Sequence, residues 1–155
     1  RGEEARPLKG QELGMQRNNC VGGDGRAGGM GAALWGRCKA GGLGVQIIAV
    51  WANSAATAAM RKAGADAAAT GENPVVVNAR DADVILGPMG ILTANALWGE
   101  ITPAMAAAVS ESPAKKVLIP VNRCSVTVVG VEQLPLGDYV KLAVEAAKDA
   151  LDEDD

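Results

Sequence analysis

Asp24-Gly25-Arg26-Ala27-Gly28-Gly29-Met30-Gly31 is the stretch that says most about how this chain folds. Its glycines at positions 25, 29 and 31 have the Gly-x-x-x-Gly-x-Gly spacing of a nucleotide-binding turn between a strand and a helix. Glycine allows the backbone to approach a ligand closely, and a helix that begins at such a turn offers unpaired N–H groups to an anion. The stretch therefore predicts an anion site, although it indicates no reaction. The alternative is that this loop has no ligand and is rich in glycine only because the whole chain is rich in glycine and alanine.

Length and composition limit the class of protein. With 155 residues, of which 48% are hydrophobic, the chain is long enough for one compact domain and too short for two of ordinary size. A net charge of -3, without a cluster of lysines and arginines, argues against nucleic acid as a partner. No apolar run approaches the length of a membrane span. We therefore expect a cytoplasmic protein with no membrane partner.

The chain has no histidine and three cysteines. Without imidazole, it cannot form a Ser-His or Cys-His pair or a histidine-ligated metal centre. Cys20, Cys38 and Cys124 match no zinc-binding spacing, and their odd number argues against a disulfide framework. We predict no metal site, and any acid or base would have to be a carboxylate, lysine, cysteine or the single tyrosine.

Short apolar segments alternate with helical patterns over residues 18–151. This alternation predicts a single α/β domain with a Rossmann-like, mostly parallel sheet and helices on both faces. Before it, residues 1–17 mix charges and glycines without a period, so we treat them as a flexible appendage, and residues 152–155 form an acidic tail. The expected strands are residues 20–21, 44–51, 67–69, 84–86, 116–121 and 125–131. The expected helices are residues 28–39, 54–63, 102–110, 138–151 and a short helix that Asn73-Pro74 opens.

Cap residues support these boundaries. Asn53 and Thr102 carry side chains that accept hydrogen bonds at a helix N-terminus, and Gly64 ends the helix that Asn53 begins. The last helix places four apolar side chains on one face. They are Val140, Val144, Ala147 and Leu151.

Polar or glycine residues follow each of the first five predicted strands. In a parallel sheet, the carboxyl ends of the strands meet at one edge, where ligands bind near the point at which the strand order reverses. We therefore expect these residues to converge on one rim. The predicted binding residues are Asp24, Gly25, Arg26, Gly28, Gly29, Met30, Gly31, Asn53, Thr70, Glu72, Gly87, Gly90, Asn122 and Arg123.

Three of these residues could carry chemistry. Arg123 follows an apolar strand, where its guanidinium could clamp a phosphate or carboxylate, or could instead be exposed or paired structurally. Asp24 and Glu72 are the candidate general bases. Each also has a structural interpretation, because Asp24 can order its own loop and Glu72 can be a carboxylate favoured at the start of a helix.

Two absences argue against a dehydrogenase. No acidic residue ends the second predicted strand to bind an adenosine ribose, since Asn53 stands there. Tyr139 is followed four residues later by Ala143, where a short-chain dehydrogenase would have lysine. A Walker-type loop is also excluded, because no Gly-Lys-Ser/Thr follows the glycines.

Further motifs accompany the glycine stretch. They are Lys62-Ala63-Gly64-Ala65, Ala69-Thr70-Gly71-Glu72-Asn73, Gly87-Pro88-Met89-Gly90-Ile91, Gly99-Glu100-Ile101-Thr102-Pro103, and Ser112-Pro113-Ala114-Lys115-Lys116 through Asn122-Arg123-Cys124. Together they resemble the uncharacterised bacterial family catalogued as domain of unknown function 3842, from about residue 21 to the final helix. The resemblance implies a small Rossmann-like bacterial protein whose glycine loop looks like a nucleotide site. This chain departs from the family loop at Arg26, Ala27 and Met30.

The sequence leaves three functions open. The first is binding of a nucleotide, a dinucleotide or another small phosphorylated ligand at residues 24–31. The second is an enzyme that uses Asp24 or Glu72 as general base. The third is a structural or regulatory protein with a vestigial pocket, which forms a homo-oligomer through residues 98–105.

Overall fold

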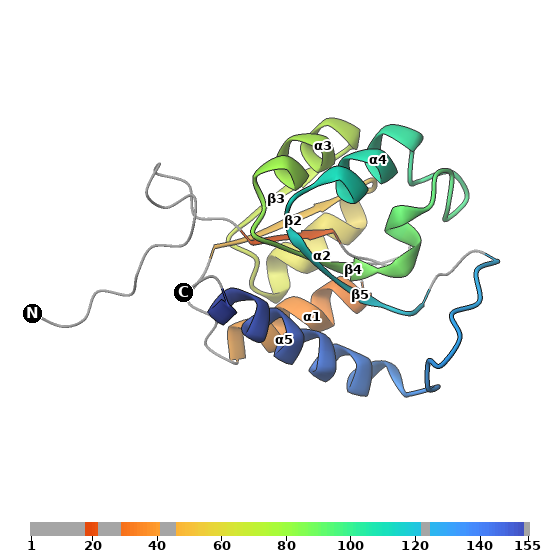
Figure 1. The fold of residues 1–155 in the computed structure, drawn as a ribbon. Helices are drawn as coiled ribbons and strands as arrows, with labels where there is room; N and C mark the ends of the chain where they lie inside the picture. The colour runs from red at the N-terminus through yellow and green to blue at the C-terminus, as the bar shows by residue number, and fades with distance from the viewer. Residues whose placement is uncertain (1–17, 22–28, 41–45, 122–124, 154–155) are drawn as a thin grey trace, which may run out of the picture.

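The computed structural model describes residues 18–21, 29–40, 46–121 and 125–153 (Figure 1). Five parallel strands form one sheet in the order β3-β2-β1-β4-β5. The strands are β1 (Asn18–Val21), β2 (Ile47–Trp51), β3 (Ala67–Thr70), β4 (Val84–Pro88) and β5 (Lys115–Ile119). The predicted parallel sheet is therefore confirmed, and β1 lies between β2 and β4.

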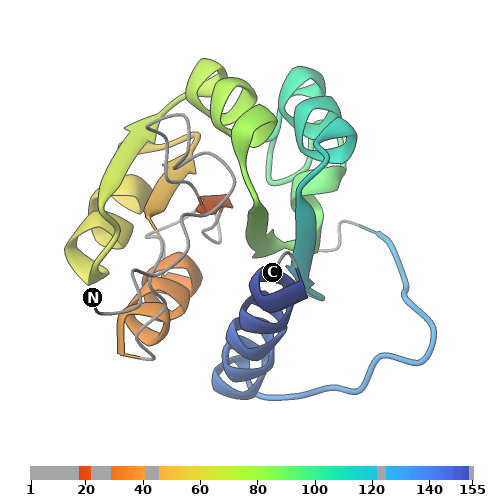
Figure 2. The same cartoon turned by 60° about the vertical axis from the view of Figure 1, so that its left-hand side comes forward.

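Helices cover both faces of this sheet. They are α1 (Gly29–Ala40), α2 (Ser54–Ala63), α3 (Glu72–Asp81), α4 (Pro103–Glu111) and α5 (Leu136–Glu153), with a short 3-10 helix, η2 (Met89–Leu92). On one face α1 packs against both α2 and α5, and on the other α3 packs against α4 (Figures 1 and 2). This arrangement confirms the single-domain α/β fold with helices on both faces.

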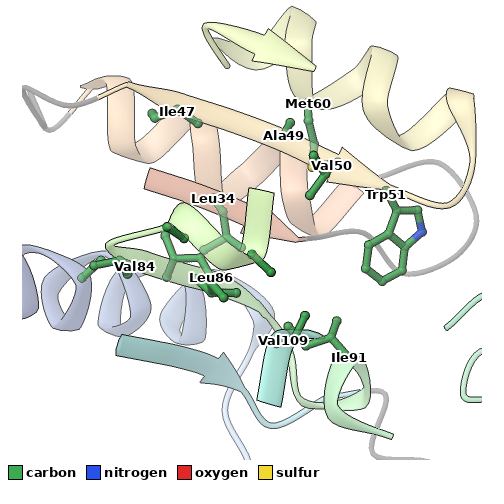
Figure 3. Close-up of a cluster of buried hydrophobic side chains, with 14 of the residues drawn as sticks. Leu34, Ile47, Ala49, Val50, Trp51, Met60, Val84, Leu86, Ile91 and Val109 are labelled. Carbon is green, nitrogen blue, oxygen red and sulfur yellow. The ribbon is translucent and has the colours of Figure 1, made fainter. Parts of the chain in front are cut away.

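Side chains from both helix layers meet at the sheet (Figure 3). All five residues of β4 are buried, as expected for a strand that helices cover on both sides. Fully buried alanines lie in the sheet and in the helices around it, at Ala49, Ala56 and Ala79. Such small side chains let the helix backbones approach the strands closely, which explains how a chain without phenylalanine fills its core.

The capping predictions are confirmed. The Asn53 Oδ1 accepts a hydrogen bond from the Ala56 N–H at 2.8 Å, and the Thr102 Oγ1 accepts one from the Met105 N–H at 3.2 Å. Gly64 ends α2 with a φ of 130°, which an L side chain rarely adopts. The predicted apolar face of α5 is also confirmed, because Val140, Val144, Ala147 and Leu151 are all buried.

Residues 125–131 do not form the strand that we expected, so this prediction was wrong. Ser125 and Gly130 have φ values of 68° and 84°, which break an extended backbone. Val126 and Val129 are exposed, and the segment runs away from β5 toward α5 (Figure 2). A valine-rich run becomes a strand only where a neighbouring strand pairs with it, and local propensity does not supply that partner.

Several boundaries also differ from the prediction. Gly71, and not Asn73, is the N-cap of α3, so Pro74 is the third residue of that helix. The strand β4 continues through Gly87 and Pro88, because these residues pair with Leu118 and Ile119 of β5. The acidic tail is partly helical, since α5 reaches residue 153. The predicted appendage at residues 1–17 lies outside the described residues.

Gly64 provides a test of the turn between α2 and β3. A Cβ at this position would lie 2.6 Å from the Lys39 Cγ, and its φ is already unfavourable for other residues. We predict that Gly64→Ala lowers the free energy of unfolding by about 1–2 kcal/mol, because both the positive φ and the close contact with Lys39 disfavour a side chain at this position. Urea unfolding followed by circular dichroism measures this change.

Gly36 is the matched control, because a Cβ there would meet nothing within 4 Å. It lies inside α1, so Gly36→Ala should raise the free energy of unfolding by about 0.5–1 kcal/mol. Equal effects of the two substitutions would contradict the assigned turn.

Asp66 joins α1 to the start of β2. Its Oδ2 accepts a hydrogen bond from the Ile47 N–H at 2.7 Å, and its Oδ1 pairs with the Lys39 Nζ at 2.9 Å. Partial burial raises the pKa of this carboxyl group, but the Ile47 and Lys39 contacts outweigh it and hold the pKa below its ordinary value. In the pH range where this carboxyl group titrates, the unfolded chain therefore binds more protons than the folded chain. The stability that the ionised Asp66 contributes is present above the ordinary pKa of aspartate and is lost as the pH falls through the lowered pKa of the folded state.

We predict that Asp66→Asn destabilises the protein near neutral pH by about 1 kcal/mol, a value reduced for solvent screening at a half-exposed site. The difference from wild type should shrink as the pH falls below the ordinary pKa of an aspartate and through the lowered pKa of this carboxyl group, because the wild-type side chain then becomes protonated. Urea unfolding of both proteins across this range measures the difference. A difference that stays constant with pH would contradict the role of the charge.

Candidate functional site

The strand order reverses at β1. From β1 the chain passes to β2 on one side, and it later returns to β4 on the other side. In open α/β sheets, the ligand crevice lies outside the carboxyl ends of the strands at such a reversal. The 12-residue helix α1 follows β1 and begins at Gly29, so the N–H groups of its first turn lie at this edge. That turn has no acidic side chain to compensate the positive end of the helix dipole.

The fold brings the described candidate residues to this same edge, on both sides of β1. Gly29, Met30 and Gly31 form the first turn of α1. On the β2 side, Asn53, Thr70 and Glu72 follow or end strands β2 and β3, and on the β4 side Gly87 and Gly90 lie in and after β4. The remaining candidates, Asp24, Gly25, Arg26, Gly28, Asn122 and Arg123, lie outside the described residues.

Asn53 has a structural role that the sequence only partly indicated. Besides capping α2, its Nδ2 donates a hydrogen bond to the Glu100 Oε1 at 2.7 Å. Asn53 follows β2, whereas Glu100 belongs to the segment between η2 and α4, which follows β4. This hydrogen bond therefore connects chain segments that leave the sheet on opposite sides of β1. Sequence reasoning missed Glu100, for which the motif Gly99-Glu100-Ile101-Thr102-Pro103 was the only signal.

Thr70 ends β3 and Glu72 begins α3, and the two residues differ in their contacts. The hydroxyl groups of Thr70 and Thr57 are hydrogen-bonded at 2.7 Å, which ties the end of β3 to α2. Glu72 is exposed in the first turn of α3, where the helix dipole favours a carboxylate. The position of Glu72 fits its structural interpretation, and the Thr70 hydroxyl group joins β3 to α2.

Gly87 and Gly90 are both buried. Gly87 pairs with Leu118 in the ladder between β4 and β5. The Gly90 carbonyl accepts a hydrogen bond from the Thr93 N–H at 3.1 Å, within the turn that follows η2. These two glycines thus shape the backbone on the β4 side of the edge.

Trp51 is the last residue of β2, and its side chain is 0% exposed. Its indole Nε1 has no hydrogen-bond partner among the described residues. Figure 3 shows this nitrogen directed beyond the end of the strand, at the carboxyl edge. A buried donor without an acceptor costs about 1–3 kcal/mol, so an acceptor at this edge would be stabilising. The Trp35 Nε1, inside α1, is also buried without a partner in the described part of the chain.

A tight turn before α4 carries the most exposed tryptophan of the described residues. Asn95, Leu97 and Trp98 have φ values of 64°, 56° and 58°, and Gly99 follows at 85°. Left-handed conformations of residues such as leucine and tryptophan persist only where the surrounding structure holds them. Here the Asn95 N–H donates to the Ile101 carbonyl at 2.6 Å. The Trp98 side chain is 105% exposed at the tip.

Two open grooves lie away from the candidate edge. One of about 350 Å³ runs between α3 and α4, lined by Arg80 and Glu111 among others. The other, of about 600 Å³, lies between α1 and α5 and carries Arg37, Lys141 and Lys148. Neither groove includes a predicted binding residue, and their charged side chains belong to exposed helix surfaces.

Two other side chains with reactive groups have structural roles. The Tyr139 hydroxyl donates to the Glu132 carbonyl and accepts from the Leu134 N–H, so it holds the segment before α5. Cys38 is buried in the core, and burial raises the pKa of its thiol to about 11. It is therefore a neutral thiol at physiological pH. None of the described helices has the length and apolar character needed to cross a membrane.

The fold and the arrangement of this edge define a single-domain, Rossmann-like α/β protein. The chain matches the family model described as Domain of unknown function (DUF3842) over residues 20–152. It therefore belongs to this family, as the motifs had indicated. Searches of curated proteins and of solved structures returned no significant match.

Proposed function

We propose that this protein binds a nucleotide or another small phosphorylated ligand at the carboxyl edge of its sheet, with the phosphate at the N-terminus of α1. The observation that carries this proposal is the position of α1. It begins directly beside the reversal of the strand order, and its first turn consists of Gly29, Met30, Gly31 and a small neighbour, Ala32. Phosphate is favoured at a helix N-terminus by both N–H donors and the helix dipole.

Trp51 supports the same edge independently. Its buried Nε1 lacks a partner in the described part of the chain and is directed toward the carboxyl end (Figure 3). A ligand oxygen would satisfy this donor. The proposal concerns binding and assigns no reaction to this edge. Of the two candidate bases, Glu72 is exposed and Asp24 lies outside the described residues.

The test is a thermal-shift screen of nucleotides and dinucleotides that contain adenine, guanine or nicotinamide. A ligand present at about 100 times its Kd should stabilise the protein by about 2.7 kcal/mol, which corresponds to roughly 5–10 °C in Tm at this size. Gly29→Val should remove the shift, because a branched side chain at the start of α1 would occupy the approach of the phosphate. A flat screen would contradict the proposal.

Trp51→Phe removes the indole N–H while keeping an aromatic ring in the core. We expect it to weaken binding of the compound that gives the largest shift by about tenfold, the effect of one lost hydrogen bond. Trp35→Phe is the matched control, because it truncates an equally buried tryptophan inside α1 and should leave the Kd unchanged. Isothermal titration calorimetry measures both affinities.

Trp98 favours a second candidate function, self-association. A fully exposed tryptophan on a turn held by backbone hydrogen bonds is the kind of residue that dominates the energy of protein interfaces. In this proposal, the turn before α4 packs against a second copy of the chain, in agreement with the interface at residues 98–105 that the sequence suggested.

If so, sedimentation equilibrium should detect a dimer of the wild-type protein that Trp98→Ser converts to monomer. The substitution removes a large apolar contact without disturbing the core, so the Tm of the monomer should not fall. Val129→Ser is the control, because Val129 is also exposed, at 93%, but lies in the segment before α5. This variant should remain a dimer. A monomeric wild-type protein at high concentration would contradict this candidate.

A further inference from the structure

We propose that Glu100 binds the vicinal hydroxyl groups of a ribose, and that Asn53 is the residue that positions it. This inference rests on the proposed function, and it narrows the ligand from any small phosphorylated compound to a ribonucleotide. It follows from the hydrogen bond that joins the Asn53 Nδ2 to the Glu100 Oε1 at 2.7 Å.

The location of this pair is informative. In dinucleotide-binding folds, an acidic residue near the end of the second strand accepts hydrogen bonds from the ribose hydroxyls. Here the second strand ends at Trp51, and the polar residue that follows is Asn53. The sequence therefore lacks the acid at that position. The fold supplies a carboxylate to the same place from the β4 side of the sheet.

Both partners of this pair are held in place. The Asn53 Oδ1 is fixed by its hydrogen bond to the Ala56 N–H, so the amide can direct only its Nδ2 toward Glu100. The Glu100 N–H donates to the Leu97 carbonyl at 3.1 Å, and the next side chain, Ile101, is buried. Preorganisation of the carboxylate lowers the entropic cost of binding a ligand.

The chemistry of the carboxylate suits a pair of hydroxyl groups. An ionised carboxylate only accepts hydrogen bonds, and its two oxygens offer about four acceptor positions. Asn53 uses one of these positions, on Oε1, and no donor from the described residues reaches Oε2. Glu100 is half-buried, so it keeps a surface that a ligand can contact. A phosphate would be repelled by this negative charge, whereas a neutral diol would not.

The experiment compares the four ribonucleoside diphosphates with their 2′,3′-dideoxy counterparts and with inorganic pyrophosphate. Isothermal titration calorimetry measures the Kd of each probe for the wild-type protein and for Glu100→Gln. The wild-type protein should bind at least one ribonucleotide about tenfold more tightly than its dideoxy counterpart, because the diol makes charge-assisted hydrogen bonds. Glu100→Gln should bring the two affinities close together without weakening the affinity for the dideoxy probe, which has no hydroxyl groups for the carboxylate to bind.

Asn53→Ser tests the positioning role. A serine at this position can still accept the Ala56 N–H and cap α2, but it has no amide N–H to hold the Glu100 carboxylate. The variant should therefore lose the preference for ribose while the Tm of the free protein falls only slightly. Glu111→Gln, at the far end of α4, is the control for loss of one negative charge and should keep the preference.

The outcomes separate this inference from the proposed function. If wild type and Glu100→Gln show the same ribose preference, or Glu100→Gln weakens both forms equally, the pair is only a structural brace and the inference is overturned while phosphate binding stands. The same conclusion follows if pyrophosphate and the dideoxy probes bind as well as the ribonucleotides. If no probe binds the wild-type protein, the proposed function fails and this inference fails with it.

Discussion

The carboxyl edge of the sheet depends on the position of β1 between β2 and β4. A parallel sheet in which the chain first moves to one side and then returns to the other leaves a gap between the two diverging connections. In this protein, α1 begins at that gap, and the Asn53–Glu100 hydrogen bond spans it from the β2 side to the β4 side. Every feature of the candidate site is defined relative to this reversal.

The core beneath this edge is built largely from small side chains. Alanines in β2, α2 and α3 are completely buried, so helices approach the strands from both faces with little space between them. The larger buried side chains include Trp51 at the end of β2, which closes the core just below the edge (Figure 3). The same tryptophan thus belongs to the packing and presents a polar group to the candidate site.

The elements that sequence reasoning located correctly are those with strong local signals. The apolar run at Val84-Ile85-Leu86, the caps at Asn53 and Thr102, and the apolar face of α5 all carry their information within a few neighbouring residues. The strand prediction for residues 125–131 failed because a strand needs a partner, and the local valines do not indicate that the chain leaves the sheet after β5. The boundary of β4 was underestimated for a related reason, since pairing with β5 extends the strand through Pro88.

By itself, the sequence determined the α/β class, the alternation of strands and helices, and the membership of a family, because hydrophobic periodicity, caps and motifs are local properties. It also placed polar residues after the strands, which was enough to predict a common edge. Only the tertiary structure decided that Glu100 meets Asn53, that the Trp51 nitrogen is buried at that edge, and that Trp98 is exposed. Each of these three facts depends on how segments far apart in the chain pack together, and no local sequence pattern encodes that packing.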